Sequence, residues 1–235
     1  MRRSLVLIAA LSALAAPRSA AAQQAGPDTR PGIAVFPFNY GGSFGARRED
    51  LAPLEVGIQQ MLMTEFAQNP SLRIVERSRL REILDEQGLV TSGQVDPSTA
   101  ARIGRLVGAR YVITGGFVDN NGDFRLDGRI VDVETSEVMR AQQVRDDKDN
   151  LYPLLVELAS RITARVNLPP LPSPVAQERR SRQIPPEAIA LYSRAQVYQD
   201  SGRNAQAIQL YEQIAREFPA MTEAREALRQ LAPGG

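Results

Sequence analysis

The chain has 235 residues, a formal charge of +1, and neither cysteine nor histidine. Without cysteine it has no disulfide, thiolate metal ligand or thiol nucleophile, and without histidine it lacks the usual catalytic relays and the commonest metal ligand. Carboxylate chemistry stays open, but no paired-carboxylate site stands out. We therefore expect a protein that is not an enzyme and holds no metal or cofactor. The nearly neutral charge predicts no nucleic-acid partner.

The first 22 residues have the three parts of a secretory signal peptide. Arg2 and Arg3 form a basic start, and residues 4–16 form an apolar run. The small residues Ala20, Ala21 and Ala22 offer a cleavage site. The apolar run is shorter than the about 20 residues of a membrane-spanning helix. Cleavage after Ala22 would start the mature chain at Gln23 and, by removing three arginines, change its formal charge to −2. We predict a periplasmic protein that is neither a lipoprotein nor an integral membrane protein.

The next part of the chain alternates between strand and helix patterns. An apolar run at residues 33–38 predicts a strand, and apolar residues three and four apart predict a helix over 54–66. A short strand at 73–75 precedes a helix that carries Leu80 and closes at Gly88. Asp96 is a typical N-cap before Pro97, and it predicts the start of another helix.

The pattern then changes to strands. Residues 111–117, 124–133 and 137–144 predict three strands, and Asn121-Gly122 between the first two is a strong hairpin signal. A further helix is expected to carry the apolar residues between 154 and 166. This order of elements predicts an α/β fold over residues 32–167, a mixed β-sheet with covering helices, a right-handed crossover and an antiparallel meander.

Two loops bear a partial likeness to ligand-binding motifs. The loop at 39–46 contains Gly41 and Gly42 but lacks the Lys-Ser/Thr of a nucleotide-binding loop, so its role is left open. Asp119 opens a calcium-loop pattern, but Phe124 and Ile130 stand where that loop needs glycine and glutamate. We interpret the first segment as a flexible loop and the second as a solvated hairpin turn.

Residues 168–184 are rich in proline and then in charge, which predicts a solvated linker. Arg179, Arg180 and Arg182 would be accessible to trypsin in such a linker. The linker would separate the α/β domain from a small all-α module at residues 185–232.

The C-terminal module resembles a tetratricopeptide repeat, a helix-turn-helix unit of about 34 residues. The matching residues are Leu191, Ala195, Tyr198, Gly202, Ala207, Tyr211 and Pro219. A generic helical hairpin is the alternative, because Arg194 stands where the family prefers an aliphatic residue. The resemblance implies a concave protein-binding face, formed by Ile189, Tyr192, Gln196, Gln199 and Asp200. One repeat plus a helix over 222–231 is less than the about three repeats of a stable solenoid, so the module needs a neighbour, a ligand or another copy.

Five motifs in the larger domain follow one another in a characteristic order. They are IAVFPF at 33–38, RIVERSRL at 73–80, LDEQG at 84–88, VGARYVITG at 107–115 and VDVET at 131–135. From residue 33 to residue 166 the chain resembles the CsgG family, named for the curli secretion channel of the bacterial outer membrane. The resemblance implies a periplasmic or outer-membrane assembly and transport component without catalytic residues.

The chain departs from the channel at two positions. In the channel, long insertions at these positions supply membrane-spanning hairpins, whereas here they hold only residues 120–123 and 146–150. We therefore expect a soluble periplasmic adaptor or assembly factor that assists export or outer-membrane biogenesis by binding envelope proteins or peptides. The alternative is a subunit of an outer-membrane curli-type secretion channel. Homo-oligomerisation and peripheral association with the outer membrane stay open, and the sequence does not identify the partner or the pathway.

Overall fold

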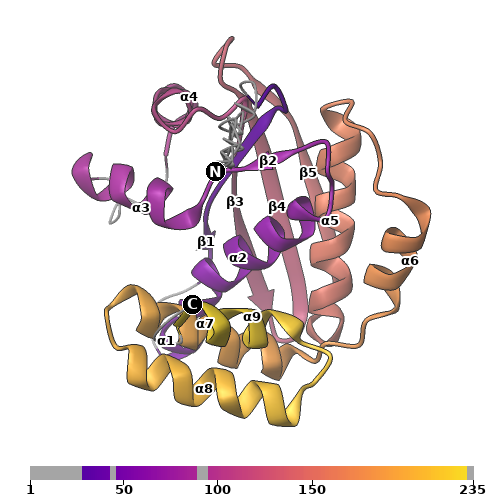
Figure 1. The fold of residues 1–235 in the computed structure, drawn as a ribbon. Coiled ribbons are helices and arrows are strands. Elements are labelled where there is room, and N and C mark those ends of the chain that lie inside the picture. The colour runs from indigo at the N-terminus through magenta and orange to yellow at the C-terminus, as the bar shows by residue number, and fades with distance from the viewer. Residues whose placement is uncertain (1–27, 43–45, 89–94, 232–235) are drawn as a thin grey trace, which may run out of the picture.

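The computed structural model describes residues 28–42, 46–88 and 95–231. The predicted signal peptide and the cleavage site before Gln23 lie outside these residues. A five-stranded mixed sheet with the strand order β2-β1-β3-β4-β5 forms the centre of the molecule, and helices surround it (Figure 1). The predicted α/β class is confirmed.

The sheet combines a parallel half with an antiparallel half. β1 (Gly32–Tyr40) pairs in parallel with β2 (Arg73–Ile74) on one side and with β3 (Tyr111–Asn120) on the other. β3, β4 (Asp123–Asp132) and β5 (Val138–Asp147) form an antiparallel meander. Asn121 and Gly122, both with positive φ, join β3 to β4 as the Asn-Gly signal predicted.

Helices cover both faces of the sheet. α2 (Pro53–Ala67), which follows the short α1 (Ala46–Leu51), and α5 (Leu151–Arg165) enclose the larger hydrophobic core on one face. α3 (Arg77–Glu86) and α4 (Pro97–Leu106) enclose a smaller core on the other face. The predicted N-cap is present, since the Asp96 carboxylate accepts hydrogen bonds from the backbone N–H groups of Ser98 and Thr99 at 3.0 and 3.1 Å.

The C-terminal helices pack against the α/β part instead of hanging from a linker. After the 3-10 turn η1 (Lys148–Asn150) and α5, the chain forms α6 (Ser173–Ser181), α7 (Pro186–Asp200), α8 (Asn204–Glu217) and α9 (Thr222–Leu231). α7 lies along α2, and side chains of α7, α8 and α9 belong to the same hydrophobic core as the sheet. The two predicted modules therefore share one core.

The segment 168–184, predicted to be a solvated linker, is exposed along most of its length but is not an irregular spacer throughout. Residues 173–181 are helical, and Arg179 is only 6% exposed. The prolines mislead because Pro174 lies in the first turn of α6, where a helix tolerates proline. The charges of Arg179 and Arg182 mislead because these two side chains pair with Glu65 and Glu223, which are distant in sequence.

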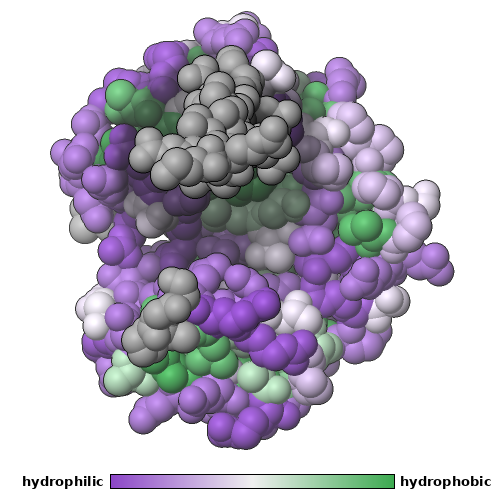
Figure 2. Space-filling model, viewed as in Figure 1, coloured by the Kyte–Doolittle hydropathy of each residue, from purple (hydrophilic) through white to green (hydrophobic). Residues whose placement is uncertain are grey.

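The outer surface is mostly polar. In Figure 2 hydrophilic residues cover most of the visible face, and apolar residues appear there in separate patches. Within the described ranges, no helix is both long and apolar enough to span a membrane.

Candidate functional site

The predicted protein-binding residues of α7 lie on the side of this helix that faces the rest of the chain. Ile189, Tyr192 and Gln196 are buried. α7 approaches α2 closely at Gly57, where a Cβ atom would lie only 1.7 Å from the Ser193 hydroxyl oxygen. The expected open groove must therefore be corrected: α2 of the same chain covers this face. The small C-terminal module was expected to need a neighbour, and here the α/β part supplies it.

The polar residues of the predicted face connect α7 to α8 and α3. Gln196 donates a hydrogen bond to the Tyr211 hydroxyl at 2.6 Å, and that hydroxyl donates to Gln199 at 2.9 Å. Gln196 also accepts a hydrogen bond of 2.6 Å from Arg77 of α3. Burial is the main cause that raises the pKa of the Tyr211 phenol, so it remains protonated and able to donate.

Asp200, at the C-terminal end of α7, is the predicted residue that reaches an open cavity. Its carboxylate pairs with Arg77 and, at 3.0 Å, with Arg81. Both arginines belong to α3, and Arg77 lies within the motif at 73–80. Sequence reasoning identified each side of this contact but not the contact itself, because the two helices are more than 100 residues apart in the chain.

Asp200 and the two arginines line a cleft of about 1030 Å³. The sheet contributes small and polar residues to it, among them Asn39 of β1 and Gly116 of β3. β4 contributes a row of charged side chains, Arg125, Asp127 and Arg129. These three residues alternate along the strand and therefore share one face of it, and they lie together along the cleft.

Most charges in the cleft are compensated within it. Arg77 and Arg81 share Asp200, and Arg125 pairs with Asp127 at 2.9 Å. The guanidinium of Arg129 has no ion pair or hydrogen bond to any residue that the structure describes. Among the same described residues, no group of three or more acidic, histidine or cysteine side chains is placed to hold a metal ion. The arrangement therefore offers polar and charged contacts to a ligand.

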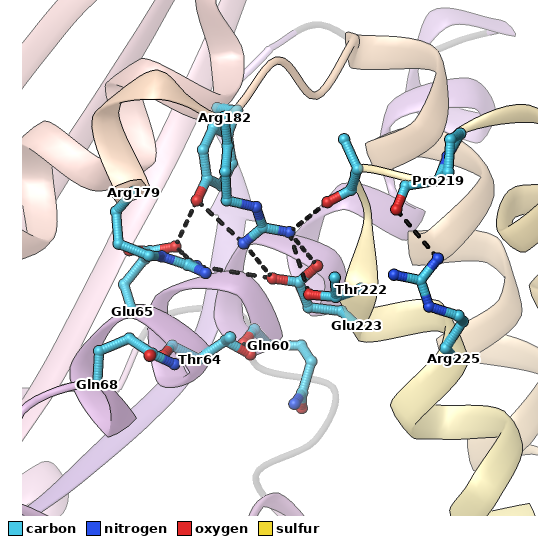
Figure 3. A network of polar contacts seen from close by, with 12 residues as sticks. Gln60, Thr64, Glu65, Gln68, Arg179, Arg182, Pro219, Thr222, Glu223 and Arg225 are labelled. Atoms are coloured by element: carbon cyan, nitrogen blue, oxygen red, sulfur yellow. Dashed lines mark hydrogen bonds and ion pairs between the residues drawn. The ribbon is translucent and has the colours of Figure 1, made fainter. Parts of the chain in front are cut away.

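A second polar cluster is closed to solvent and holds the helices together (Figure 3). Arg179 of α6 donates to Glu65 of α2, with one of these contacts at 3.0 Å. Arg182 donates to both oxygens of Glu223 of α9, at 2.8 and 2.7 Å. Tyr152 of α5 joins the two pairs, since its hydroxyl donates to Glu65 at 3.1 Å and accepts from Arg182 at 3.2 Å.

This buried cluster has the character of a structural junction. Its charged side chains are at most 10% exposed, and each has a partner of opposite charge. Burial is the main cause that raises the pKa of the Tyr152 phenol, so Tyr152 remains a hydrogen-bond donor. The sequence does not reveal the junction, because Glu65 and Arg179 are 114 positions apart and no local pattern relates them.

Comparison with known proteins gives a family match for the N-terminal half. Residues 13–121 match the family model described as "Curli production assembly/transport component CsgG". The search of curated proteins gives no significant match.

Several solved structures are similar at low sequence identity. The LpoB C-terminal domain from Escherichia coli has a TM-score of 0.40 and 21% identity, and the similarity covers 50% of this chain and 83% of that one. Lipoprotein GNA1162 from Neisseria meningitidis has a TM-score of 0.34 and 14% identity, and the similarity covers 58% of this chain and 96% of that one. The PelC dodecamer from Paraburkholderia phytofirmans has a TM-score of 0.35 and 12% identity, and the similarity covers 60% of this chain and 89% of that one.

The family match includes β1, α2, β2, α3, α4 and β3, and with them four of the five sequence motifs. β4, β5 and α5 complete the sheet and its core, but they lie beyond the matched residues. The match supports a CsgG domain at residues 13–121, in agreement with the resemblance seen in the sequence.

Proposed function

We propose that this protein is a soluble periplasmic adaptor or assembly factor of CsgG type. It assists export or outer-membrane biogenesis through contacts with other envelope proteins, and it is not an enzyme. The CsgG match, together with an open cleft lined by residues of both the CsgG-like part and α7, supports this proposal. The cleft is the observation that carries it, because it offers a partner a site that combines charged, polar and apolar groups.

The C-terminal helices have a changed role in this proposal. Their resemblance to a tetratricopeptide repeat suggested a groove, but α2 covers Ile189, Tyr192 and Gln196. We assign the contribution of α7 to its C-terminal end, where Asp200 stands in the wall of the cleft. The outward side of α9 carries charged residues such as Arg225 and Glu226, which suit the end of a helical stack.

The adaptor is favoured over a channel subunit by two short connections. Only Asn121 and Gly122 separate β3 from β4, and β5 leads directly into η1 at Lys148. These are the positions at which the resemblance to the channel would place long insertions.

The proposal includes secretion by a signal peptide that is removed after Ala22. Protein purified from the cell envelope should have the mass of a chain that begins at Gln23 and carries no lipid. Intact-mass spectrometry measures this directly, and a retained signal or an added acyl mass would contradict this part of the proposal.

Reciprocal capture tests the adaptor role. The tagged full chain is cross-linked in living cells and purified from the periplasm, and each captured protein is then tagged to recover this chain. The control is the same chain made without its first 22 residues, which should stay in the cytoplasm and capture none of these partners. The proposal fails if no envelope protein is captured in both directions and if loss of the protein leaves export and the outer membrane unchanged.

A further inference from the structure

The position of the cleft follows from how the chain connects the parallel strands. β1 lies between β2 and β3 in the sheet. The connection from β1 to β2 runs through α2 on one face, and the connection from β2 to β3 runs through α3 and α4 on the other face. Where the connections leave toward opposite faces, the carboxyl ends of neighbouring strands border a crevice, and such crevices are the usual ligand sites of open α/β sheets.

The residues of the cleft match this topological position. α2 contributes Val56 and Gln59, whereas α3 contributes Arg77 and Arg81. The register of β1 against β3 shifts between Val35 and Phe38, at the start of the part of β1 that lines the cleft. Bulges of this kind often lie next to binding sites because they redirect side chains and bend the strand. The cleft is thus a consequence of the chain topology.

We infer that this cleft binds an extended acidic peptide segment of a partner protein, with a carboxylate of the peptide placed against Arg129. The inference deepens the proposed adaptor function and rests on it. At about 1030 Å³ the cleft is at the upper end of the range of about 300–1,000 Å³ that is typical of small-molecule pockets. A peptide of several residues suits a space of this size.

The lining of the cleft favours a peptide over a polyanion. Arg77, Arg81 and Arg125 face aspartates of the same cleft, so a nucleic acid or another polyanion would meet carboxylates beside every one of them. Apolar side chains such as Pro37 and Val118 line the cleft together with the charged groups. A peptide can match this mixture because it carries both apolar side chains and backbone hydrogen-bonding groups.

Arg129 sets the charge of the expected ligand. It lies opposite Thr114 of β3, and the pairing of β4 with β5 shifts in register around it, between Gly128 and Ile130. Among the described arginines of the cleft it is the one without an acidic partner. A carboxylate there would form a charge-assisted hydrogen bond, which is the strong class of hydrogen bond and fits the fork of an arginine.

Selection from a random peptide library on the full chain tests the inference. The enriched peptides should contain aspartate or glutamate. Binding of a fluorescent copy is then measured by polarisation to the unchanged chain, to Arg129→Gln and to Val118→Trp, which fills the cleft. Arg129→Gln should weaken binding by about tenfold or more, the value of one lost charged hydrogen bond. Val118→Trp should weaken it at least as much, because the indole occupies space that the peptide needs. The control Arg180→Gln, on the exposed side of α6, should bind like the unchanged chain.

A double-mutant cycle locates the carboxylate. Replacing the acidic residue of the peptide by its amide should weaken binding to the unchanged chain but cause little further loss with Arg129→Gln. Circular dichroism confirms that each variant is folded. The inference is overturned if no peptide is enriched, or if binding ignores both cleft substitutions. Binding of a neutral N-acetylglucosamine oligomer that Val118→Trp abolishes, with no peptide bound, would overturn it in favour of a glycan site.

The adaptor function can survive failure of this inference. If reciprocal capture recovers the same partner with Val118→Trp as with the unchanged chain, the protein is an adaptor that uses another surface. If capture fails for the unchanged chain as well, the proposed function itself fails.

Discussion

Glu65 and Arg179 illustrate what a single buried charge requires. The carboxylate of Glu65 lies in the protein interior, where an unpaired charge costs several kcal/mol. Arg179 and the Tyr152 hydroxyl both donate hydrogen bonds to it. The guanidinium of Arg179 also lies 5.7 Å from the centre of the Tyr152 ring. Because these groups come from α2, α5 and α6, their pairing fixes three helices relative to one another.

Removing Arg179 should therefore strongly destabilise the fold. Arg179→Ala leaves Glu65 buried without its cation, and we expect the free energy of unfolding to fall by about 3–5 kcal/mol. The matched control is Arg180→Ala, at the next position of α6 and on its exposed side. This substitution should change the free energy of unfolding by about 0.5 kcal/mol or less. Urea unfolding measures both. Equal effects of the two substitutions would contradict the assignment of a buried junction.

The pairing of Glu223 with Arg182 should make stability depend on pH. Burial raises the pKa of Glu223, but the hydrogen bonds and positive charge of Arg182 outweigh it, and the net pKa lies below the usual 4.5. A lowered pKa means that the ionised carboxylate stabilises the folded state. This contribution is complete above pH 4.5 and is lost as the pH falls through the folded-state pKa.

Glu223→Gln should consequently be most destabilising at neutral pH. The difference in unfolding free energy between this variant and the unchanged protein should shrink as the pH falls below about 4.5. Urea titrations from neutral pH to acid provide the comparison. A difference that stays constant through the acid range would show that the Glu223 carboxylate does not contribute through its charge.

At the scale of elements, the contact between α2 and α7 depends on a residue without a side chain. Gly57 faces Ser193, whose hydroxyl donates to the Ile189 carbonyl oxygen at 2.6 Å. A Cβ at position 57 would overlap the Oγ and Cβ atoms of Ser193. The two helices approach this closely because neither presents a bulky group at the crossing. This approach also covers the face of α7 that was expected to bind a partner.

Gly57→Ala should destabilise the protein although alanine favours helices by about 1 kcal/mol. The overlap at Ser193 forces the helices apart, and overpacking of this kind costs about 1–3 kcal/mol. Adding Ser193→Gly removes the overlapping atoms, so the double variant should recover part of the loss. Hydrogen exchange of the α7 amides and urea unfolding report the effect. If the double variant is less stable than Gly57→Ala alone, so that Ser193→Gly only lowers the free energy of unfolding further, the two residues do not share this contact.

At the scale of the whole molecule, the α/β part and the C-terminal helices share one hydrophobic core. Tyr211 of α8 and Leu158 of α5 belong to the same core cluster. The structural junction around Glu65 and Arg179 connects α6 and α9 to α2 and α5. A helical hairpin with one further helix has little core of its own. Its stability must therefore come from the surface of α2.

We expect the two parts to unfold in a single transition. Hydrogen exchange resolved by peptide should give the same denaturant midpoint for β3 and for α8, because both lose the shared core together. For the same reason trypsin should cleave slowly at Arg179 and Arg182 in the folded protein, and faster in the Arg179→Ala variant at Arg182. Early unfolding of α7–α9, or rapid release of this segment by trypsin, would restore the two-module interpretation.

Local signals in the sequence were sufficient for most elements of the fold. The run at 33–38 lies within β1, the pair Asn121-Gly122 forms its turn, Asp96 caps α4, and the helix expected at 222–231 is α9. These features depend on neighbours within a few residues, through hydrophobic periodicity, φ preference and capping. The motif order that indicated the CsgG resemblance is of the same kind, and the family match supports it over residues 13–121.

The tertiary structure decided what no local signal contains. The sequence presents 168–184 as a solvated spacer, because nothing near Arg179 reveals Glu65 as its partner. The groove on α7 was implied by the resemblance to a tetratricopeptide repeat, and only the packing of Gly57 against Ser193 shows that α2 covers this face. The cleft likewise joins residues of four strands and four helices. The physical reason is the same in each case: burial and charge pairing depend on which surfaces meet in space.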